Sequence, residues 1–147
     1  MSYFDGFIVP VPKTKREEYR SLAEISAAVL KEFGAIRVVE CWSDASGPSA
    51  DSYHAIEARQ DESAYRSFAD AVAPGPDEIL AWSWVEWPDK ATRDAGMEKA
   101  MADPRLQFQD RPVVFDGTRL IAGGFEPLLD TGPADSAVPP ASFKAPD

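Results

Sequence analysis

The stretch that decides the fold is residues 79–87, which read ILAWSWVEW. Aromatic and branched apolar side chains dominate this run, and such residues favour a β-strand. Pro88 and Asp89 turn the chain away from the strand, and we expect a helix from about Lys90 to Ala102, ended by Pro104. A strand joined directly to a helix is part of a β-α-β unit, so further strands are expected on either side.

The N-terminal third of the chain contains a second unit of the same kind. Residues 3–11, YFDGFIVPV, are rich in strand-forming side chains. Pro10 has no N–H to donate to a ladder, so we place it at the end of this strand. Residues 35–42, AIRVVECW, form the next expected strand, and a polar run ends it.

Between these strands the sequence predicts a long amphipathic helix. Thr14 and Glu17 have the spacing of a capping box, which satisfies free backbone amides at a helix start. Gly34 is the usual stop. Apolar or small residues recur between these points at steps of three or four, at Tyr19, Leu22, Ser26, Val29 and Phe33.

The remaining segments are less periodic. Residues 44–77 are expected to form an extended loop or a short helix. Asp116-Gly117, between the apolar runs 113–115 and 118–121, has the composition of a two-residue type I′ hairpin turn. A last strand should then extend to about residue 129. From residue 131 to 147 proline and small residues replace any pattern, so we expect a disordered tail after one domain of residues 1–130.

The order of these elements predicts an α+β protein. Strand, helix, strand, loop, strand, helix, strand is the β-α-β-β-α-β arrangement of ferredoxin-like domains. It packs two helices on one face of a four-stranded antiparallel sheet. The other face then needs a second cover or a ligand, so we expect the chain to form a homodimer.

Composition excludes several classes of function. The 147 residues carry a formal charge of -10, which would repel a phosphate backbone, so we expect no nucleic-acid partner. No apolar run is long enough to cross a membrane, and residues 1–9 lack the features of an export signal, which predicts a cytoplasmic protein. With a single cysteine, Cys41, and a single histidine, His54, we expect no metal site and no cofactor.

Several short motifs resemble the bacterial YbaA-like family of unknown function. They occur in the expected order across residues 3–130, and they read YFDGFIVPVP at 3–12, EFGA at 32–35, VECW at 39–42, WSWVEWP at 82–88, ADPR at 102–105, FDG at 115–117 and GGFE at 123–126.

The resemblance implies a dimeric α/β-barrel of ferredoxin-like protomers and brings no reaction with it. An RNA-related role has been attached to some members, and the acidic charge speaks against it here. The chain departs from the family pattern over residues 43–76, where it is longer. The family also suggests an extended segment near Phe68 to Val72, where the spacing of apolar residues instead indicates a helix.

Two carboxylates are candidates for acid–base chemistry, because each lies in a strand beside tryptophans and burial would raise its pKa. They are Glu40 and Glu86. The alternative is that each is an ordinary carboxylate at a strand end, paired with an arginine such as Arg37 or Arg119.

The tryptophans near these carboxylates could line a pocket for a flat ligand, because indole combines apolar area with one donor. The four that could do so are Trp42, Trp82, Trp84 and Trp87, and the pocket is expected near the first three. Alternation does not say which face of the sheet they occupy. Alternatively they are core or dimer interface. The sequence therefore predicts either binding of a small apolar or aromatic molecule in a barrel pocket or a non-enzymatic interaction dimer, and it assigns no catalytic residue.

Overall fold

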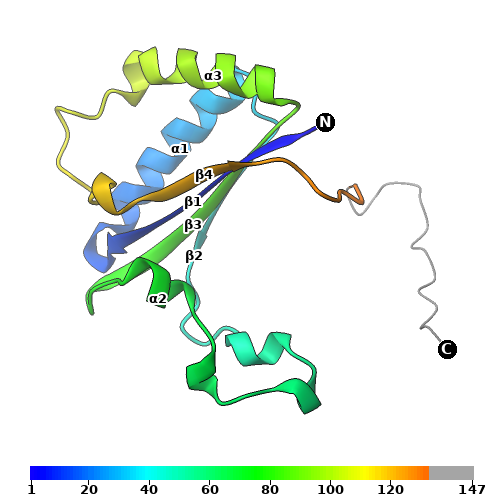
Figure 1. Cartoon of the computed structure of the whole chain (residues 1–147). Helices are drawn as coiled ribbons and strands as arrows, with labels where there is room; N and C mark the ends of the chain where they lie inside the picture. Colours follow the sequence, from blue (N-terminus) through cyan, green and yellow to red (C-terminus); the bar gives the residue numbers. More distant parts are fainter. Residues whose placement is uncertain (133–147) are drawn as a thin grey trace.

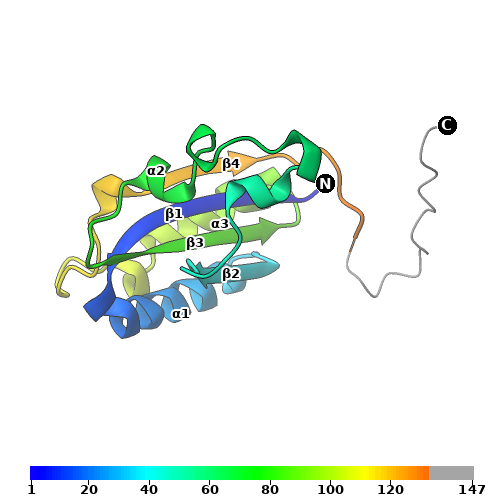
Figure 2. The same cartoon turned by 90° about the horizontal axis from the view of Figure 1, so that it is seen from below.

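A computed structural model describes residues 1–132 of the chain, so most of the expected tail lies outside the described residues. Its centre is a four-stranded antiparallel sheet in the order β2-β3-β1-β4. Two long helices, α1 and α3, cover one face of this sheet, and the segment containing α2 lies on the other side (Figure 1). Figure 2 shows the strands side by side in this order. The predicted α+β, ferredoxin-like architecture is confirmed.

Most element bounds lie close to the expected ones, but the last strand, expected to extend to about residue 129, ends at Phe125. In chain order they are β1 (Tyr3–Pro12), α1 (Arg16–Glu32), β2 (Arg37–Trp42), α2 (Phe68–Val72), β3 (Glu78–Trp87), α3 (Lys90–Ala102) and β4 (Ile121–Phe125). Short 3₁₀ turns join several of them.

Strand β1 extends past the proline that was expected to end it. Pro10 is fully buried and stands opposite Leu80 of β3, and the strand ends only at Pro12. On its other side β1 pairs with β4 over Phe4–Ile8 alone. Beyond that point β1 has one neighbouring strand. A proline is tolerated there because no second strand needs a backbone N–H from this position.

Helix α1 begins later than its capping pattern indicates. A 3₁₀ turn occupies Lys13–Lys15, and the helix starts at Arg16 without a side-chain cap, so the capping box predicted at Thr14 is wrong. Its end is as predicted, because Gly34 has φ +116°, which an L side chain rarely adopts. None of the helices within residues 1–132 combines the length and apolar character needed to span a bilayer.

The core lies between the sheet and these two helices. One cluster of buried residues contains Trp87 and Val85 of β3, with Val29 of α1 and Ala100 of α3 packed on them. A second cluster lies toward the other end of β1 and includes Val9, Val11, Tyr19, Ala81 and Val114. Every other residue of β3 points at the helices, so burial alternates from Ala81 to Trp87, whereas Val9, Pro10 and Val11 of β1 are all buried.

The expected hairpin at Asp116-Gly117 is absent. Residues 113–115 form no strand, and Gly117–Arg119 is a 3₁₀ turn capped by the Asp116 carboxylate, which accepts a hydrogen bond from the Thr118 amide at 2.9 Å. Val114 is buried in the second core cluster. Val114 and Phe115 therefore pack on the core instead of pairing in the sheet, and Val113 is exposed.

Residues 43–77, which we call the arm, leave the sheet after β2 and return to it at β3. The arm holds three 3₁₀ turns and α2. The helix that the spacing of apolar residues indicated at 68–72 is therefore confirmed, and the extended segment that the family resemblance suggested there is wrong. Ser67 and Asp70 form a capping box at its start. The Glu78 carboxylate fixes the base of the arm, because it accepts from the Gly75 amide at 2.7 Å and pairs with Arg119 at 2.8 Å.

Candidate functional site

The strand register separates the five predicted site residues into two groups. Glu40 stands opposite Ser83, and Trp42 stands opposite Ala81, so both point toward the helices with those buried residues. The other three, Trp82, Trp84 and Glu86, occupy the alternate positions of β3 and therefore point to the uncovered face. The two strands therefore do not bring all five to one side, because antiparallel pairing places Glu40 opposite Ser83 and not opposite a tryptophan.

Glu40 and Trp42 lie in a cleft between α1 and the edge strand β2, which we call the α1–β2 cleft. Its volume is about 360 Å³. Helix α1 contributes Tyr19 and, one and two turns further on, Ala23 and Ala27, whose small side chains leave room between helix and strand. Val38 completes an apolar wall on the strand side. The cleft is thus an apolar slot with a carboxylate inside it.

The Glu40 carboxylate is held by a tyrosine. The Tyr19 hydroxyl donates a hydrogen bond to Glu40 Oε2 at 2.8 Å. The Glu40 side chain is exposed, because the cleft is open to solvent. Protein atoms nevertheless surround its carboxylate closely, and the resulting desolvation raises the pKa of Glu40. Hydrogen bonds from Tyr19 and Ser83 oppose the rise without cancelling it.

Tyr19 stays protonated, so it acts as a fixed hydrogen-bond donor. Burial, followed by the negative charge of Glu40, raises the pKa of its hydroxyl far above the ordinary value. Its ring is packed between Trp42, at 5.1 Å between centroids, and Phe115, at 5.8 Å. These contacts lock the orientation of the hydroxyl toward Glu40.

Sequence reasoning missed Tyr19 as a site residue. It was assigned only to the apolar stripe of α1, and a tyrosine in such a stripe is a detectable signal, because its buried hydroxyl needs a partner. Ser83 and Phe115 could not be predicted from the sequence as neighbours of the site. Ser83 comes near Glu40 through the pairing of β2 with β3, and Phe115 comes near Tyr19 through the path of residues 113–115 over the core.

The second group lies on the uncovered face of the sheet. Trp84 packs against Phe4 at 6.0 Å between ring centroids, and the Arg37 guanidinium lies 5.1 Å from the centre of its ring. Trp82 is 43% exposed and Phe125 of β4 is 61% exposed. This face is therefore an apolar surface and not an enclosed pocket.

The arginine pairing considered for the two carboxylates does not occur. Arg37 stacks on Trp84 and Arg119 pairs with Glu78. In the part of the chain that the structure describes, neither Glu40 nor Glu86 takes part in a salt bridge.

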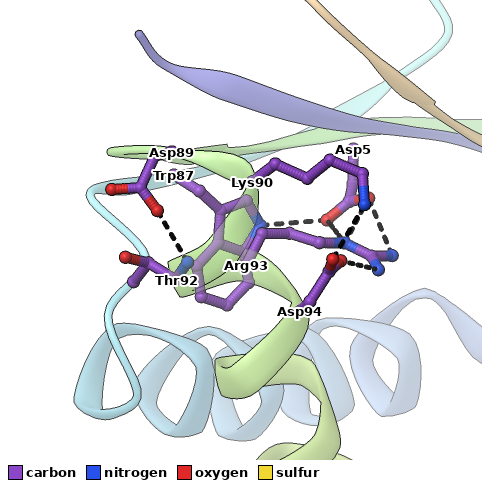
Figure 3. A network of polar contacts seen from close by, with 7 residues as sticks. All are labelled: Asp5, Trp87, Asp89, Lys90, Thr92, Arg93 and Asp94. Atoms are coloured by element: carbon purple, nitrogen blue, oxygen red, sulfur yellow. Dashed lines mark hydrogen bonds and ion pairs between the residues drawn. The ribbon is translucent and has the colours of Figure 1, made fainter.

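Another buried carboxylate, Asp5, belongs to the framework (Figure 3). Its side chain is 2% exposed and accepts from Trp87 Nε1 at 2.9 Å. The Arg93 guanidinium of α3 pairs with it at 3.0 Å, and Arg93 in turn contacts Asp94 at 3.2 Å. Both Asp5 oxygens are thus engaged by protein groups, and the network ties β1, β3 and α3 together.

The arm carries a larger hollow, with a volume of about 1040 Å³, which is open to solvent as the α1–β2 cleft is. Three of the four carboxylates that line it accept hydrogen bonds within the arm. Asp61 accepts from the Ser63 amide at 3.0 Å, and Asp70 accepts from the Ser67 amide at 2.8 Å. His54 lies against the Tyr65 ring at 4.5 Å and reaches the Ala50 carbonyl. These groups stabilise the turns of the arm, so the α1–β2 cleft is the better candidate site.

The fold and this cleft define an α+β protein with one helix-covered and one open sheet face. The chain belongs to the family described as a protein of unknown function (DUF1428), whose model matches residues 2–117. It is 39% identical over 132 residues to the uncharacterized protein YbaA of Escherichia coli K12, covering 88% of this chain and 99% of that protein. YbaA of Shigella flexneri matches to the same extent. The resemblance seen in the sequence motifs is confirmed.

Two solved structures have a related outline. The structure of Rv0793 from Mycobacterium tuberculosis aligns with a TM-score of 0.44 at 9% identity, covering 90% of this chain and all of that one. A dimeric ferredoxin-like protein from an uncultured marine organism aligns with a TM-score of 0.41 at 14% identity, covering 85% and 92% of the two chains.

Proposed function

We propose that this protein binds a small, largely apolar molecule in the α1–β2 cleft. The observation that carries the proposal is a slot of about 360 Å³ with a partly desolvated carboxylate inside it. Ligand sites are usually apolar hollows of roughly 300–1,000 Å³ with few, well-placed polar groups. Glu40 and Tyr19 supply such a polar pair, and the cleft size suits a ligand with a single aromatic ring.

The sequence of α1 supports a site that is already formed without its ligand. Ala23 and Ala27 face the strand at positions where larger apolar residues would fill the cleft. Tyr19, by contrast, is immobilised by two aromatic neighbours. A preformed site of this kind loses little entropy on binding.

Binding can be tested by filling the cleft. A library of single-ring fragments is screened by NMR against labelled protein, with the amide signals of β2 as the readout. Ala27→Leu places a larger side chain in the cleft, whereas Ala28→Leu adds the same atoms on the exposed side of α1. We expect fragments to shift β2 signals in the wild type and in Ala28→Leu, and not in Ala27→Leu. Hits that persist in Ala27→Leu, or no hits at all, would contradict the proposal.

We also propose that the protein is a homodimer that buries the open sheet face of each copy. Trp82 and Phe125 leave apolar surface there that a second copy would cover. The charges on this face balance, since Arg37 stands opposite Glu86 and Glu78 is paired with Arg119. For a chain of net charge -10, a locally neutral face is where two copies repel each other least. A cytoplasmic location is part of the proposal, supported by the exposed, unpaired thiol of Cys41.

Light scattering coupled to size exclusion tests the dimer. The chain mass is 16.1 kDa, so a dimer is expected at twice that value. Trp82→Glu should shift the mass to that of a monomer, because it buries a charge in the interface. Met101→Glu changes an apolar residue on α3 that is 56% exposed, and it should leave the dimer intact. A monomeric wild type would contradict this assembly.

A further inference from the structure

Glu40 has one oxygen engaged by the protein and one left for a ligand. Oε2 accepts from the Tyr19 hydroxyl. Across residues 1–132 no hydrogen bond or ion pair reaches Oε1 within the usual distances, although the Ser83 hydroxyl lies near the carboxylate. The carboxylate therefore presents a free acceptor beside an apolar wall.

The charges around this carboxylate leave it without a counter-ion. Of the groups on α1 that line the cleft or its rim, Arg20 pairs with Glu24 at 3.5 Å, and the Arg16 guanidinium lies over the Trp42 ring, 5.8 Å from its centre. Strand β3 contributes the neutral hydroxyl of Ser83, and Tyr19 stays protonated. A carboxylate that is partly desolvated and unpaired gains most from a ligand that brings a positive charge.

We propose that the ligand of the α1–β2 cleft is a small organic ammonium ion: a protonated amine on an apolar, single-ring body. The inference rests on the binding site proposed above and names the chemical class of its ligand. The ammonium group donates to Glu40 Oε1, and the apolar body lies along Ala23, Ala27 and Val38. The aromatic ring of Trp42 adds apolar area beside the charge.

Ligands of other charge are disfavoured by the same groups. A carboxylate on the same body would meet Glu40 and, at the rim, Glu24. An alcohol can donate one hydrogen bond to Oε1 but brings no charge. An alcohol and an ammonium group both form a charge-assisted hydrogen bond with the carboxylate, but the ammonium group adds the Coulomb attraction between two opposite charges.

Three probes with one body separate these cases: 2-phenylethylamine, 2-phenylethanol and phenylacetate. Each is titrated at pH 7 into the wild type, with NMR shifts of β2 amides as the readout. We expect the amine to bind about tenfold or more tightly than the alcohol, because of this added Coulomb attraction. Phenylacetate should not bind. The affinity for the amine should fall as the pH is lowered and Glu40 takes up a proton.

Two variants assign the effect to the carboxylate. Glu40→Gln keeps an acceptor for Tyr19 and removes the charge, so it should make the amine bind no better than the alcohol. Glu18→Gln removes an exposed charge elsewhere on α1 and should leave the preference unchanged. The inference is overturned if amine and alcohol bind equally to the wild type, or if Glu40→Gln keeps the preference.

The same titrations distinguish failure of the inference from failure of the proposed site. If the alcohol binds as well as the amine, and Ala27→Leu removes both, the cleft is a ligand site and only the ammonium class is wrong. If none of the three probes shifts β2 signals at millimolar concentration, both the class and the site are contradicted.

Discussion

The two faces of the sheet use the same residue type in opposite ways. Trp87 points at the helices, is 0% exposed and donates its indole N–H to Asp5. Trp82, five residues earlier in the same strand, points away from the helices and is 43% exposed. The difference shows that a tryptophan in β3 is core or surface according to strand position, because the long helices α1 and α3 lie over one face only. The α1–β2 cleft lies where that covering stops, at the edge strand.

The largest expected effect comes from truncating Trp87. Trp87→Ala removes a fully buried ring and leaves Asp5 with one partner fewer, so it should lower the free energy of unfolding by about 3–5 kcal/mol. Denaturant unfolding measures the loss, and Trp87→Phe provides a milder variant if the alanine form does not fold. Trp82→Phe is the matched change on the open face. If Trp82→Phe and Trp87→Phe lower the free energy of unfolding equally, the two faces of the sheet do not differ in how much their tryptophans stabilise the fold.

The polar network behind Trp87 should come second. Asp5→Asn removes the charge that faces Arg93, and the unfolding free energy should fall by about 2–3 kcal/mol, as for a hydrogen bond to a charged group. Asp94→Asn removes an exposed partner of the same arginine and should cost less than about 1 kcal/mol. If the two variants are equally stable, the buried pair does not anchor the helix-covered face.

A smaller effect tests how tightly α3 lies on that face. A Cβ at Gly96 would stand 2.6 Å from the Phe33 carbonyl oxygen and 2.6 Å from Trp87. Gly96→Ala should therefore destabilise the protein by about 1–3 kcal/mol through overpacking. Gly117 has open space around its Cβ position, so Gly117→Ala should be neutral in the same thermal unfolding experiment. A neutral Gly96→Ala would mean that the helix can move away from the sheet at little cost.

The smallest effect concerns the cleft and depends on pH. The pKa of Glu40 is raised in the folded protein, so the folded state holds this proton more tightly than the unfolded state does. Its contribution to stability is present at low pH and is lost as the pH rises from the ordinary pKa of a glutamate through the raised one. Glu40→Gln should match the wild type in acid and become the more stable of the two toward neutral pH. A difference that does not change with pH contradicts the raised pKa.

Much of the fold was predictable because its signals are local. The composition of residues 79–87, the helix after Asp89 and the stop at Gly34 each depend on neighbours within a few positions. The hairpin at Asp116-Gly117 was wrong for the opposite reason. Val114 and Phe115 before it pack on a distant part of the core, and nothing nearby in the sequence distinguishes a covering loop from a strand.

The candidate site was only partly predictable. Glu40 and Trp42 do lie together in a cleft, and each strand does alternate as expected. Their grouping with Trp82, Trp84 and Glu86 failed, and Tyr19 was not recognised as the partner of Glu40.

The sequence by itself determined the order of strands and helices, the acidic character of the chain and the family to which it belongs. Only the tertiary structure decided which tryptophans are core, which carboxylate has no counter-ion and where the cleft lies. The physical reason is that alternation divides the side chains of a strand between two faces but does not show which face is buried. Which face is buried depends on the register between β2 and β3 and on the packing of α1. Both arise from contacts between residues far apart in the chain.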